Sequence, residues 1–471
     1  MSGPRKSARA LTLLREFESR NVTFLEADGS WPIVWDKASG VRVLDVEGRK
    51  YLDLTAAFGV AAAGHANPRV VRAGQRQMAR LLHAMGDVHP HRLKGELARE
   101  LSQLTFGRWG AGRGRVGSFR TSRTRATKGK TIFCNSGFEA VEAALKTALL
   151  ATGKAGIIAF AGAYHGLGYG ALNATHRVHF RGPFKPQLRQ FCHFVPFPGP
   201  LLQAGSPFYA SLPEATVQRV SMDQVEAQIT DLLRCGKIGA VLVEPIQVRG
   251  GLNVPPPDFL PRLRQLCDDH EALLILDEIY TGFGRTGKWF ACEHWGVVPD
   301  LICLGKALTG GFPLSACVGR AELMDSAWPP STGEAIHTST FLGHPVGCAM
   351  ALAQLREIRS RRLVQRSARL GGLLRQSLFG LPSPSSGFRW SARGVGLLAG
   401  LEVRRTDGTP AGDKALRVVK SMLQRGFILL PEGHDSEVIG FSPPLTITAA
   451  QLRRAVRALG ESLLENCTSQ T

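Results

Sequence analysis

The sequence predicts an α/β protein with a mainly parallel central sheet covered by helices, together with a smaller α+β domain. Through the middle of the chain, short continuous apolar runs rich in β-branched residues alternate with segments of helical periodicity. Runs of this kind are typical of strands that are buried on both faces, as in parallel sheets. Towards the C-terminus, strand-like and helical segments mix without this alternation, which indicates the second domain.

The elements before this pattern follow from local periodicity. Apolar and polar residues alternate around a glycine in residues 41–56, which predicts a β-hairpin. Apolar positions recur at helical spacing over 69–83 and 92–105, so we expect a helix in each. The segment TIFCNSG then predicts a short strand, and the following EAVEAALKTALLATGK predicts a helix from its period and its residue propensities.

The later elements follow from the same signals. Apolar runs predict central strands at 156–164, 239–246, 272–279 and 301–306. Helical spacing predicts helices at 222–234, 258–270, 344–360, 362–378 and 449–465. Strand-like runs in the tail are GLLAGLEV, GFILLPEG and EVIGFSP. We therefore expect the large domain to span residues 66–335 and the small domain to combine residues 1–65 with 336–471.

The composition bounds the class of protein. The chain has 471 residues, of which 44% are hydrophobic and 20% charged, as in ordinary globular proteins. No apolar run approaches the roughly 18–20 residues of a membrane helix, and the first residues lack the apolar core and cleavage site of a secretory signal. The nine cysteines form no C-x-x-C pair, so we expect reduced thiols and a cytoplasmic location.

The chain is strongly basic, with 58 Lys and Arg against 38 Asp and Glu and a net charge of +20. A dense part of this charge lies in residues 108–130, which are rich in Gly, Ser, Thr and Arg and almost free of aliphatic residues. We expect a flexible, exposed insertion there. Such a segment could bind nucleic acid or an acidic protein, but we favour a solvated loop, and nucleic acid is not an expected partner.

Candidate residues for chemistry stand where the predicted strands end, because ligands of open parallel sheets bind at the carboxyl ends of the strands. These residues are Ser136, Gly137, Tyr164, His165, Glu244, Gln247, Asp277, Glu278 and Lys306. Lys306 is the most unusual of them, since it comes directly after an apolar run and lysine is rarely buried. A desolvated lysine has a lowered pKa and becomes a nucleophile that forms Schiff bases.

Pyridoxal phosphate requires several of these parts together. Its aldehyde takes a lysine, its ring nitrogen takes an aspartate and its phosphate takes a cluster of N–H donors. Lys306 and Asp277 could supply the first two, and Tyr164 could stack on the ring. The turn at Ser136 opens a helix, whose N-terminal N–H groups suit a phosphate, although Ser136 and Glu139 also fit a capping box.

A competing motif lies at residues 282–287, where GFGRTG fits the G-x-G-x-x-G pattern of dinucleotide sites and follows a predicted strand. A dinucleotide site also needs a helix that begins at the motif and an acid about 20 residues further on. The chain continues as KWFACEHWGVVPD, which contains no amphipathic helix of that length. The sequence therefore argues against a dinucleotide site.

A set of motifs occurs in a fixed order along nearly the whole chain: FCNSGFEAVEAALK, AYHG, VEPIQ, LILDEIYTGFGRTGKWFACE, PDLICLGKALTGGFPLSA and HTSTFLGHP. In these motifs the chain resembles the class III pyridoxal-phosphate-dependent aminotransferases, which have fold type I. The resemblance implies transfer of an amino group from an amino acid or ω-amine donor to a keto acid through a Schiff base on Lys306. An aminomutase, a decarboxylase and an amino-phospholyase of the same fold are the alternatives.

The resemblance also implies the residues of the site. Lys306 would bind the cofactor and move a proton, Asp277 would pair with the ring nitrogen, and Tyr164 would stack on the ring. Thr340 would reach the phosphate of the cofactor in a neighbouring subunit, which implies a homodimer. No metal is expected. The other cofactor-binding residues would be Ser136, Gly137, Phe138, His165, Glu244, Gln247, Ile279 and Tyr280.

Four positions depart from residues common in that family, and one of them is Tyr280, in DEIYTG where DEVQTG is common. Leu167 stands where members that use glutamate often have an arginine, Arg249 replaces the glutamate of EPIQGEGG, and Gly440 stands near the place of an arginine before P-P-L. These departures weaken the case for 2-oxoglutarate as the acceptor. We hypothesise that Arg249 binds a substrate carboxylate or phosphate, the alternative being an exposed loop arginine. Phe58 is expected to shape the substrate pocket.

Overall fold

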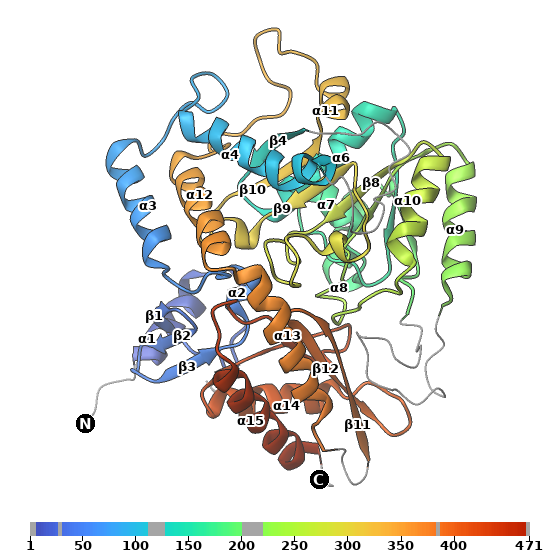
Figure 1. Ribbon diagram of the computed structural model, residues 1–471. Coiled ribbons are helices and arrows are strands. Elements are labelled where there is room, and N and C mark those ends of the chain that lie inside the picture. The colour runs from blue at the N-terminus through green and yellow to red at the C-terminus, as the bar shows by residue number, and fades with distance from the viewer. Residues whose placement is uncertain (1–5, 27–30, 112–127, 200–219, 383–386, 468–471) are drawn as a thin grey trace.

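A computed structural model describes residues 6–26, 31–111, 128–199, 220–382 and 387–467 (Figure 1). Its largest element is a seven-stranded sheet in the strand order β4-β10-β9-β8-β7-β5-β6. The strands are β4 (Gly129–Cys134), β5 (Gly156–Phe160), β6 (Cys192–Val195), β7 (Ile238–Val243), β8 (Leu273–Asp277), β9 (Leu301–Leu304) and β10 (Ser315–Arg320).

The sheet is parallel except at one strand. The pairs β6–β5, β5–β7, β7–β8 and β8–β9 are all parallel, whereas β10 runs antiparallel to both of its neighbours, β9 and β4. The prediction of an α/β fold with a mainly parallel sheet is confirmed. Because β5, β7, β8 and β9 point the same way, their carboxyl ends meet at one edge of the sheet.

Helices cover the sheet on both faces. Successive side chains of a strand point to opposite sides, so each apolar central strand contributes side chains to two cores, one on each face. Leu274 and Leu276 of β8 belong to a core that includes residues of α9 (Met222–Arg234) and α10 (Phe259–Asp269). Ile275, between them, belongs to a second core with the small, apolar face of α6 (Gly137–Thr152). The central strands are therefore buried on both sides, as their continuous apolar sequences predict.

Further helices surround this large unit (Figure 1). Those of eight or more residues are α1 (Lys6–Phe17), α3 (Pro68–Arg80), α4 (Arg92–Ser102), α12 (Pro345–Ser360), α13 (Leu363–Phe379), α14 (Gly412–Gln424) and α15 (Ala449–Cys467). Short ones are α2 (Ala56–Gly59), α5 (Arg108–Ala111), α7 (Tyr169–Ala174), α8 (Val178–Arg181) and α11 (Ala321–Ala327). Other short helical segments, which are not α-helices, lie at Gln103–Gly107, Gly182–Gln187, Ala291–His294 and Lys306–Leu308.

Two four-stranded sheets form the smaller part of the molecule. One has the order β1-β2-β3-β13 and the other β11-β12-β15-β14. Their strands are β1 (Trp35–Ser39), β2 (Arg42–Asp45), β3 (Lys50–Asp53), β11 (Phe388–Val395), β12 (Leu398–Arg405), β13 (Phe427–Ile428), β14 (Leu430–Glu432) and β15 (Val438–Phe441). The predicted hairpin is the antiparallel pair β2–β3. Since β13 pairs with β3, the N-terminal and C-terminal parts of the chain share one sheet. The domain boundaries stay a prediction.

Two segments singled out in the sequence have different outcomes. Most of the basic run 108–130 lies outside the described residues, and its two ends belong to α5 and β4. The GFGRTG segment forms consecutive turns rather than the start of a helix, as expected. Its Arg285 is buried and donates hydrogen bonds to the carbonyl oxygens of Leu397 and Pro443, so it joins this turn to the C-terminal part of the chain.

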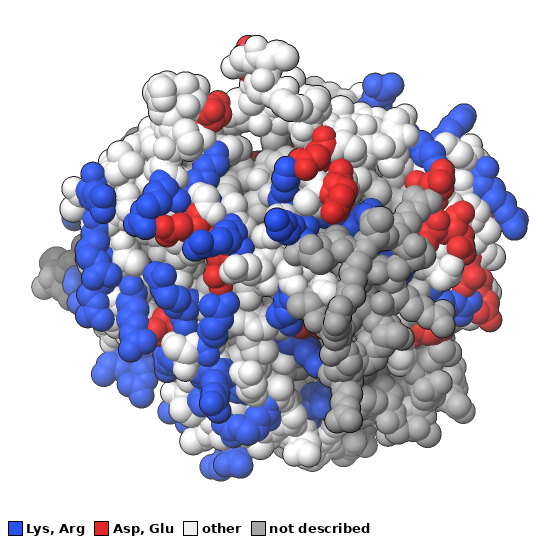
Figure 2. All heavy atoms as spheres, turned by 45° about the horizontal axis from the view of Figure 1, so that its top comes forward, with Lys and Arg blue, Asp and Glu red and all other residues white. Residues whose placement is uncertain are grey.

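The excess of positive charge is spread over the surface. Figure 2 shows Lys and Arg side chains over much of one face, with acidic side chains gathered mainly along one side of it. Four exposed arginines follow one another along α3, at 69, 72, 76 and 80. Among the described residues, no helix combines the length and apolarity needed to cross a membrane.

A buried carboxylate fixes the position of β9. Asp300, directly before this strand, is 5% exposed and accepts a hydrogen bond from the backbone N–H of Leu274 in β8 at 2.7 Å. Its carboxylate also pairs with Arg264 of α10 at 2.7 Å and with Arg320 of β10 at 2.6 Å. Burial alone would raise the pKa of Asp300, but the charges of the two arginines hold it below its ordinary value.

We expect Asp300→Ala to lower the free energy of unfolding by about 3–5 kcal/mol, because it leaves two arginines near a buried site without their shared acid. Chemical denaturation at neutral pH would measure this. The lowered pKa means that the contribution of Asp300 is present above about pH 4 and is lost as the pH falls through the folded-state pKa. The control is Asp325→Ala, which removes an exposed partner of Lys130 and should cost less than about 1 kcal/mol. Equal costs for the two variants would contradict this account.

Candidate active site

Lys306 lies in the turn directly after β9, at the carboxyl edge of the sheet. Its φ angle of 38° is in the left-handed region, and such strain in non-glycine residues is concentrated at functional sites. Its Nζ lies 4.6 Å from the centroid of the Tyr280 ring. Burial lowers the pKa of Lys306, although the charges of Asp277 and Glu244 oppose the shift. A lowered pKa increases the fraction of free amine, which is the form that attacks a carbonyl.

Asp277 ends the neighbouring strand, β8, where it pairs in register with Cys303 of β9. One carboxylate oxygen, Oδ2, is 2.8 Å from Nδ1 of His165, and the other accepts a hydrogen bond from the backbone N–H of Ile279 at 3.1 Å. The Nε2 atom of this histidine is buried and has no hydrogen-bond partner among the described residues. These contacts hold the carboxylate in one orientation beside the cavity that contains Lys306.

Glu244 and Tyr164 form the adjoining wall. Glu244 follows β7 and accepts a hydrogen bond from the backbone N–H of Tyr164 at 3.0 Å. Burial raises the pKa of Glu244 to about 7, against the opposing charges of His165 and Lys306. The Tyr164 ring makes an edge contact with Phe180, with 5.4 Å between the centroids. An aromatic face and an acid that titrates near neutrality therefore stand beside the amine.

The N-terminus of α6 opens towards the same cavity. Ser136 precedes the helix, but its side chain caps none of the helix N–H groups; its hydroxyl donates instead to Glu139 at 3.1 Å. The Glu139 carboxylate turns back to the N–H of Asn135 at 2.9 Å, so the capping box considered from the sequence does not form. The N–H groups of Gly137 and Phe138 have no partner among the described residues, which leaves two donors and the positive end of a helix for an anion.

These groups surround a cavity of about 400 Å³. A Cβ atom on Gly137 would lie 3.1 Å from Ile279 and one on Gly166 would lie 2.3 Å from Phe138, so both glycines allow a close approach of the backbone. The lining residues are Gly137, Phe138, Tyr164, His165, Gly166, Leu167, Glu244, Ile246, Arg249, Asp277, Ile279, Tyr280, Thr281 and Lys306.

Five residues considered for the site do not line this cavity. One of them, Glu278, is buried and accepts hydrogen bonds from the backbone N–H groups of Ala291 and Cys292, both at 2.8 Å. Ser136 contributes its carbonyl oxygen to the hydroxyl of Ser315. Gln247 is buried behind the wall, where its Nε2 donates to the carbonyl oxygen of Ala161 at 2.8 Å. Phe58, which is half exposed, belongs to four consecutive residues with positive φ. The last of them, Gly59, lies against the Tyr280 ring. Thr340 is exposed on the segment that precedes α12.

The structure also adds residues that the sequence did not single out. Glu432 of β14 pairs with Arg249 at 2.9 Å, and Ser442 makes a hydrogen bond with the Tyr280 hydroxyl at 3.1 Å. Both come from the C-terminal part of the chain. The sequence offered one signal for Glu432, because an acidic residue is unusual within an apolar run such as GFILLPEG. Nothing in the sequence indicated which residue this acid would contact.

The cavity has the parts that pyridoxal phosphate needs. A partly buried amine and an oriented carboxylate face it, unpaired N–H groups at a helix N-terminus suit the phosphate, and an aromatic side chain stands at its wall. The fold and this site together define an enzyme of the pyridoxal-phosphate type. When bound, the cofactor supplies an aldehyde that takes up the amino group and a ring that withdraws electrons from the substrate.

Comparison with known proteins identifies the family. Residues 25–463 match the family model "Aminotransferase class-III". The chain is 36% identical to putrescine aminotransferase of Pectobacterium atrosepticum over 95% of this chain and 86% of that one, and 34% identical to acetylornithine aminotransferase of Methanosarcina mazei over 93% of each. The solved structure of ornithine aminotransferase from Toxoplasma gondii superposes with a TM-score of 0.78, at 28% identity and over 98% and 96% of the two chains.

The chain therefore belongs to the class III aminotransferase family, and it is a pyridoxal-phosphate-dependent transaminase. The resemblance read from the sequence motifs is confirmed, and so are the fold class and the cofactor. The individual roles of the site residues stay predictions.

We expect Asp277→Asn to lower kcat by about 100-fold or more, because the variant keeps the shape of the side chain but loses the negative charge that the ring nitrogen requires. Steady-state kinetics with a saturating donor and acceptor would measure this. The visible absorption of the variant would show whether it still binds the cofactor. Asp325→Asn, at an exposed site, is the matched control. Activity within a few-fold of the wild type would show that Asp277 does not have this role.

Proposed function

We propose that Lys306, Asp277 and Tyr164 carry the transamination in this chain. The observation that carries the proposal is the meeting of the Lys306 amine, the Asp277 carboxylate and the open N-terminus of α6 at one cavity. Lys306 binds the cofactor aldehyde and moves a proton as general acid and base, for which its lowered pKa suits it. Asp277 keeps the ring nitrogen protonated, Tyr164 stacks on the ring, and the N–H groups of Gly137 and Phe138 hold the phosphate.

The proposed amino donor is a compound with a primary amine on a terminal carbon. Putrescine, acetylornithine and ornithine, which name the relatives above, all carry such an amine. Leu167 and Ile246 add apolar surface to the cavity, which suits the methylene chain of such a donor. The proposed acceptor is a keto acid. Arg249 lines the cavity and is the cation that can bind the carboxylate of this acceptor.

A two-step spectroscopic assay tests this function. Putrescine or N-acetylornithine is added alone to the purified holoenzyme, and the visible absorption of the bound cofactor should be lost. Pyruvate added next should restore it and yield alanine, because transamination needs both substrates. Lys306→Ala is the control and should give no such cycle. A product that forms fully without any keto acid would instead indicate an aminomutase, a decarboxylase or a lyase.

We propose a homodimer in which Thr340 contributes to the site of the partner subunit. The segments around residues 81–91 and 336–344 lie side by side, joined by a hydrogen bond from Thr338 to Asp87 at 2.7 Å and by one between the His91 ring and the carbonyl oxygen of Gly343 at 2.7 Å. Both segments expose large apolar side chains, and such a group is uncommon on a surface that remains in contact with water. These are Leu82, Met85, Val88, Ile336 and Phe341, each more than half exposed.

A second copy of the chain is the proposed cover of this apolar surface, and Thr340 lies within it. Sedimentation equilibrium should give the mass of two chains, and the double variant Leu82→Glu/Phe341→Glu should shift the equilibrium towards the monomer, because it places charges in the interface. Leu464→Glu, also at an exposed leucine but on α15, is the control. A wild-type monomer at micromolar concentration would contradict the proposal.

The nine free cysteines support a reducing compartment, and we propose that the protein is located in the cytoplasm.

A further inference from the structure

A second cavity lies in the smaller part of the molecule. Its volume is about 710 Å³, against about 400 Å³ for the active-site cavity, and the two cavities share no lining residue. One wall comes from the strands β2, β3 and β13, and the other comes from α15 (Figure 1). The turn between α14 and β13 adds Arg425 and Gly426. A cavity of this size is large enough for a small-molecule ligand.

The register of the strands brings two cations to the sheet wall of this cavity. Arg42 of β2 pairs with Leu52 of β3, and Leu52 pairs in turn with Phe427 of β13, so the three side chains point to the same face. Lys50 lies two residues before Leu52 and therefore points to that face as well. Leu52 and Phe427 are buried, whereas Arg42 and Lys50 are exposed. The sheet wall thus combines a buried apolar floor with two exposed cations.

The helical repeat brings two further cations to the helix wall. Arg454 and Arg457 of α15 are three residues apart, so they lie on one face of the helix. The guanidinium carbon of Arg454 is 5.2 Å from the centroid of the Phe427 ring, which places this cation over the floor. Arg453, next to it in the sequence, is exposed and does not line the cavity. Among the described residues that line the cavity, Glu461 is the only acid.

Most of the cations in the cavity have no acidic partner. Arg425 pairs with Glu461 at 3.0 Å and with Glu465 at 2.5 Å, so its charge is balanced. The side chains of the other four form no hydrogen bond or ion pair within the part of the chain that the structure describes; they are Arg42, Lys50, Arg454 and Arg457. The two walls therefore present four unbalanced positive charges to one space.

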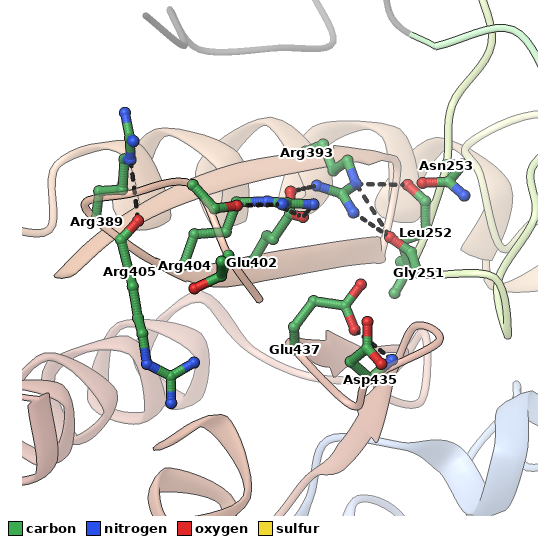
Figure 3. A network of polar contacts seen from close by, with 12 residues as sticks. Gly251, Leu252, Asn253, Arg389, Arg393, Glu402, Arg404, Arg405, Asp435 and Glu437 are labelled. Atoms are coloured by element: carbon green, nitrogen blue, oxygen red, sulfur yellow. Dashed lines mark hydrogen bonds and ion pairs between the residues drawn. The ribbon is translucent and has the colours of Figure 1, made fainter. Parts of the chain in front are cut away.

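Arginines in the neighbouring C-terminal sheet are paired with acids. Figure 3 shows the Glu402 carboxylate shared by Arg393 and Arg404, at 2.6 and 2.7 Å. Arg405 of the same sheet pairs with Asp413 of α14 at 2.7 Å. The overall excess of basic residues thus does not by itself leave the arginines of this region without partners. The shortage of acids is a local property of the cavity.

Cations that line one cavity create a strong positive potential, because the walls exclude water and concentrate the field. An anion bound between the walls removes the repulsion among the cations and gains charge-assisted hydrogen bonds. Each phosphate group of a ligand carries about −1.5 to −2 charges near pH 7. Two or three phosphate groups would therefore balance the four cations, whereas each carboxylate supplies only one negative charge. Arginine also matches phosphate in geometry, since its planar group donates two parallel hydrogen bonds.

We propose that this cavity is a polyphosphate site, which binds a chain of two or more phosphate groups between the sheet wall and the helix wall. Arg42 and Lys50 hold the phosphates from one side, and Arg454 and Arg457 hold them from the other. Such a chain is present in inorganic polyphosphates and in nucleoside triphosphates. The proposal goes beyond the transaminase activity, because no residue that lines the active-site cavity takes part in it.

Calorimetry of the holoenzyme with tripolyphosphate and with ATP, at about 150 mM salt and without divalent cations, tests the proposal. We expect one molecule of each probe per chain and weaker binding as the salt concentration rises, because salt screens these exposed charges. The visible absorption of the cofactor should not change, since the probe occupies the other cavity. Equal affinities would assign the binding to the phosphate chain alone, and tighter binding of ATP would show that the nucleoside adds contacts. Either result supports the proposal.

Variants of both walls and of the acid show where the probe binds. Arg42→Gln and Arg454→Gln, one on each wall, should each weaken tripolyphosphate binding about tenfold, because each removes a charge-assisted hydrogen bond. Glu461→Gln should tighten binding several-fold, because it removes the acid from the cavity and one partner from Arg425. A variant that merely damaged the fold would not bind more tightly. Arg453→Gln is the matched control on α15 and should change the affinity by less than about twofold.

Three results would overturn the proposal. The first is the absence of binding of both probes at about 1 mM. The second is equal weakening by Arg453→Gln and Arg454→Gln, which would show that the probe is attracted by the net charge of +20 and not held in the cavity. The third is unchanged affinity in Arg42→Gln, which would mean that the probe does not lie between the two walls. Since no turnover is measured, these results are independent of the donor assay.

Discussion

The structure depends on the register between β8 and β9, because this register decides which side chains meet at the carboxyl edge of the sheet. Asp300 sets it with both its backbone and its side chain: its N–H donates to the carbonyl oxygen of Leu274 at 2.9 Å, and its carboxylate accepts the N–H of the same residue. Asp277 then lies beside Cys303, and Lys306 follows in the next turn. A slip of one residue would turn every side chain of β9 to the opposite face and would take the amine away from the carboxylate.

Much of this could be predicted from the sequence, because buried parallel strands have continuous apolar runs and their ends are marked by polar residues. β8 and β9 lie within the predicted ranges, and β7 begins one residue before its range. Asp277 and Lys306 line one cavity, as their positions suggested. β10 could not be found in this way, since SACVGR is short, rich in small residues and follows a glycine-rich turn. α14 and β1 were also not predicted. β1 (WDKAS) shows no alternation of apolar and polar residues, because it lies at the edge of its sheet and is largely exposed.

Contacts between distant parts of the chain were the other limit. Local patterns carry no information on which residue of β14 will face the loop after β7, so the partner of Arg249 could not be named. The same holds for Gly440, whose meaning depends on the side chain of the neighbouring strand. The family motifs predicted the shared chemistry, whereas the features particular to this chain became visible only when the C-terminal strands were placed against the site.

The central claim is that Lys306 is the residue to which the cofactor is joined, and borohydride reduction followed by peptide mass spectrometry tests it most directly. Reduction makes the link between the amine and the cofactor permanent, so the modified lysine can be read from the fragment masses. The account predicts one pyridoxyl group per chain, on the peptide that contains Lys306, and none on the corresponding peptide of Lys306→Ala. A group on any other lysine, or none on a protein supplied with the cofactor, would contradict it.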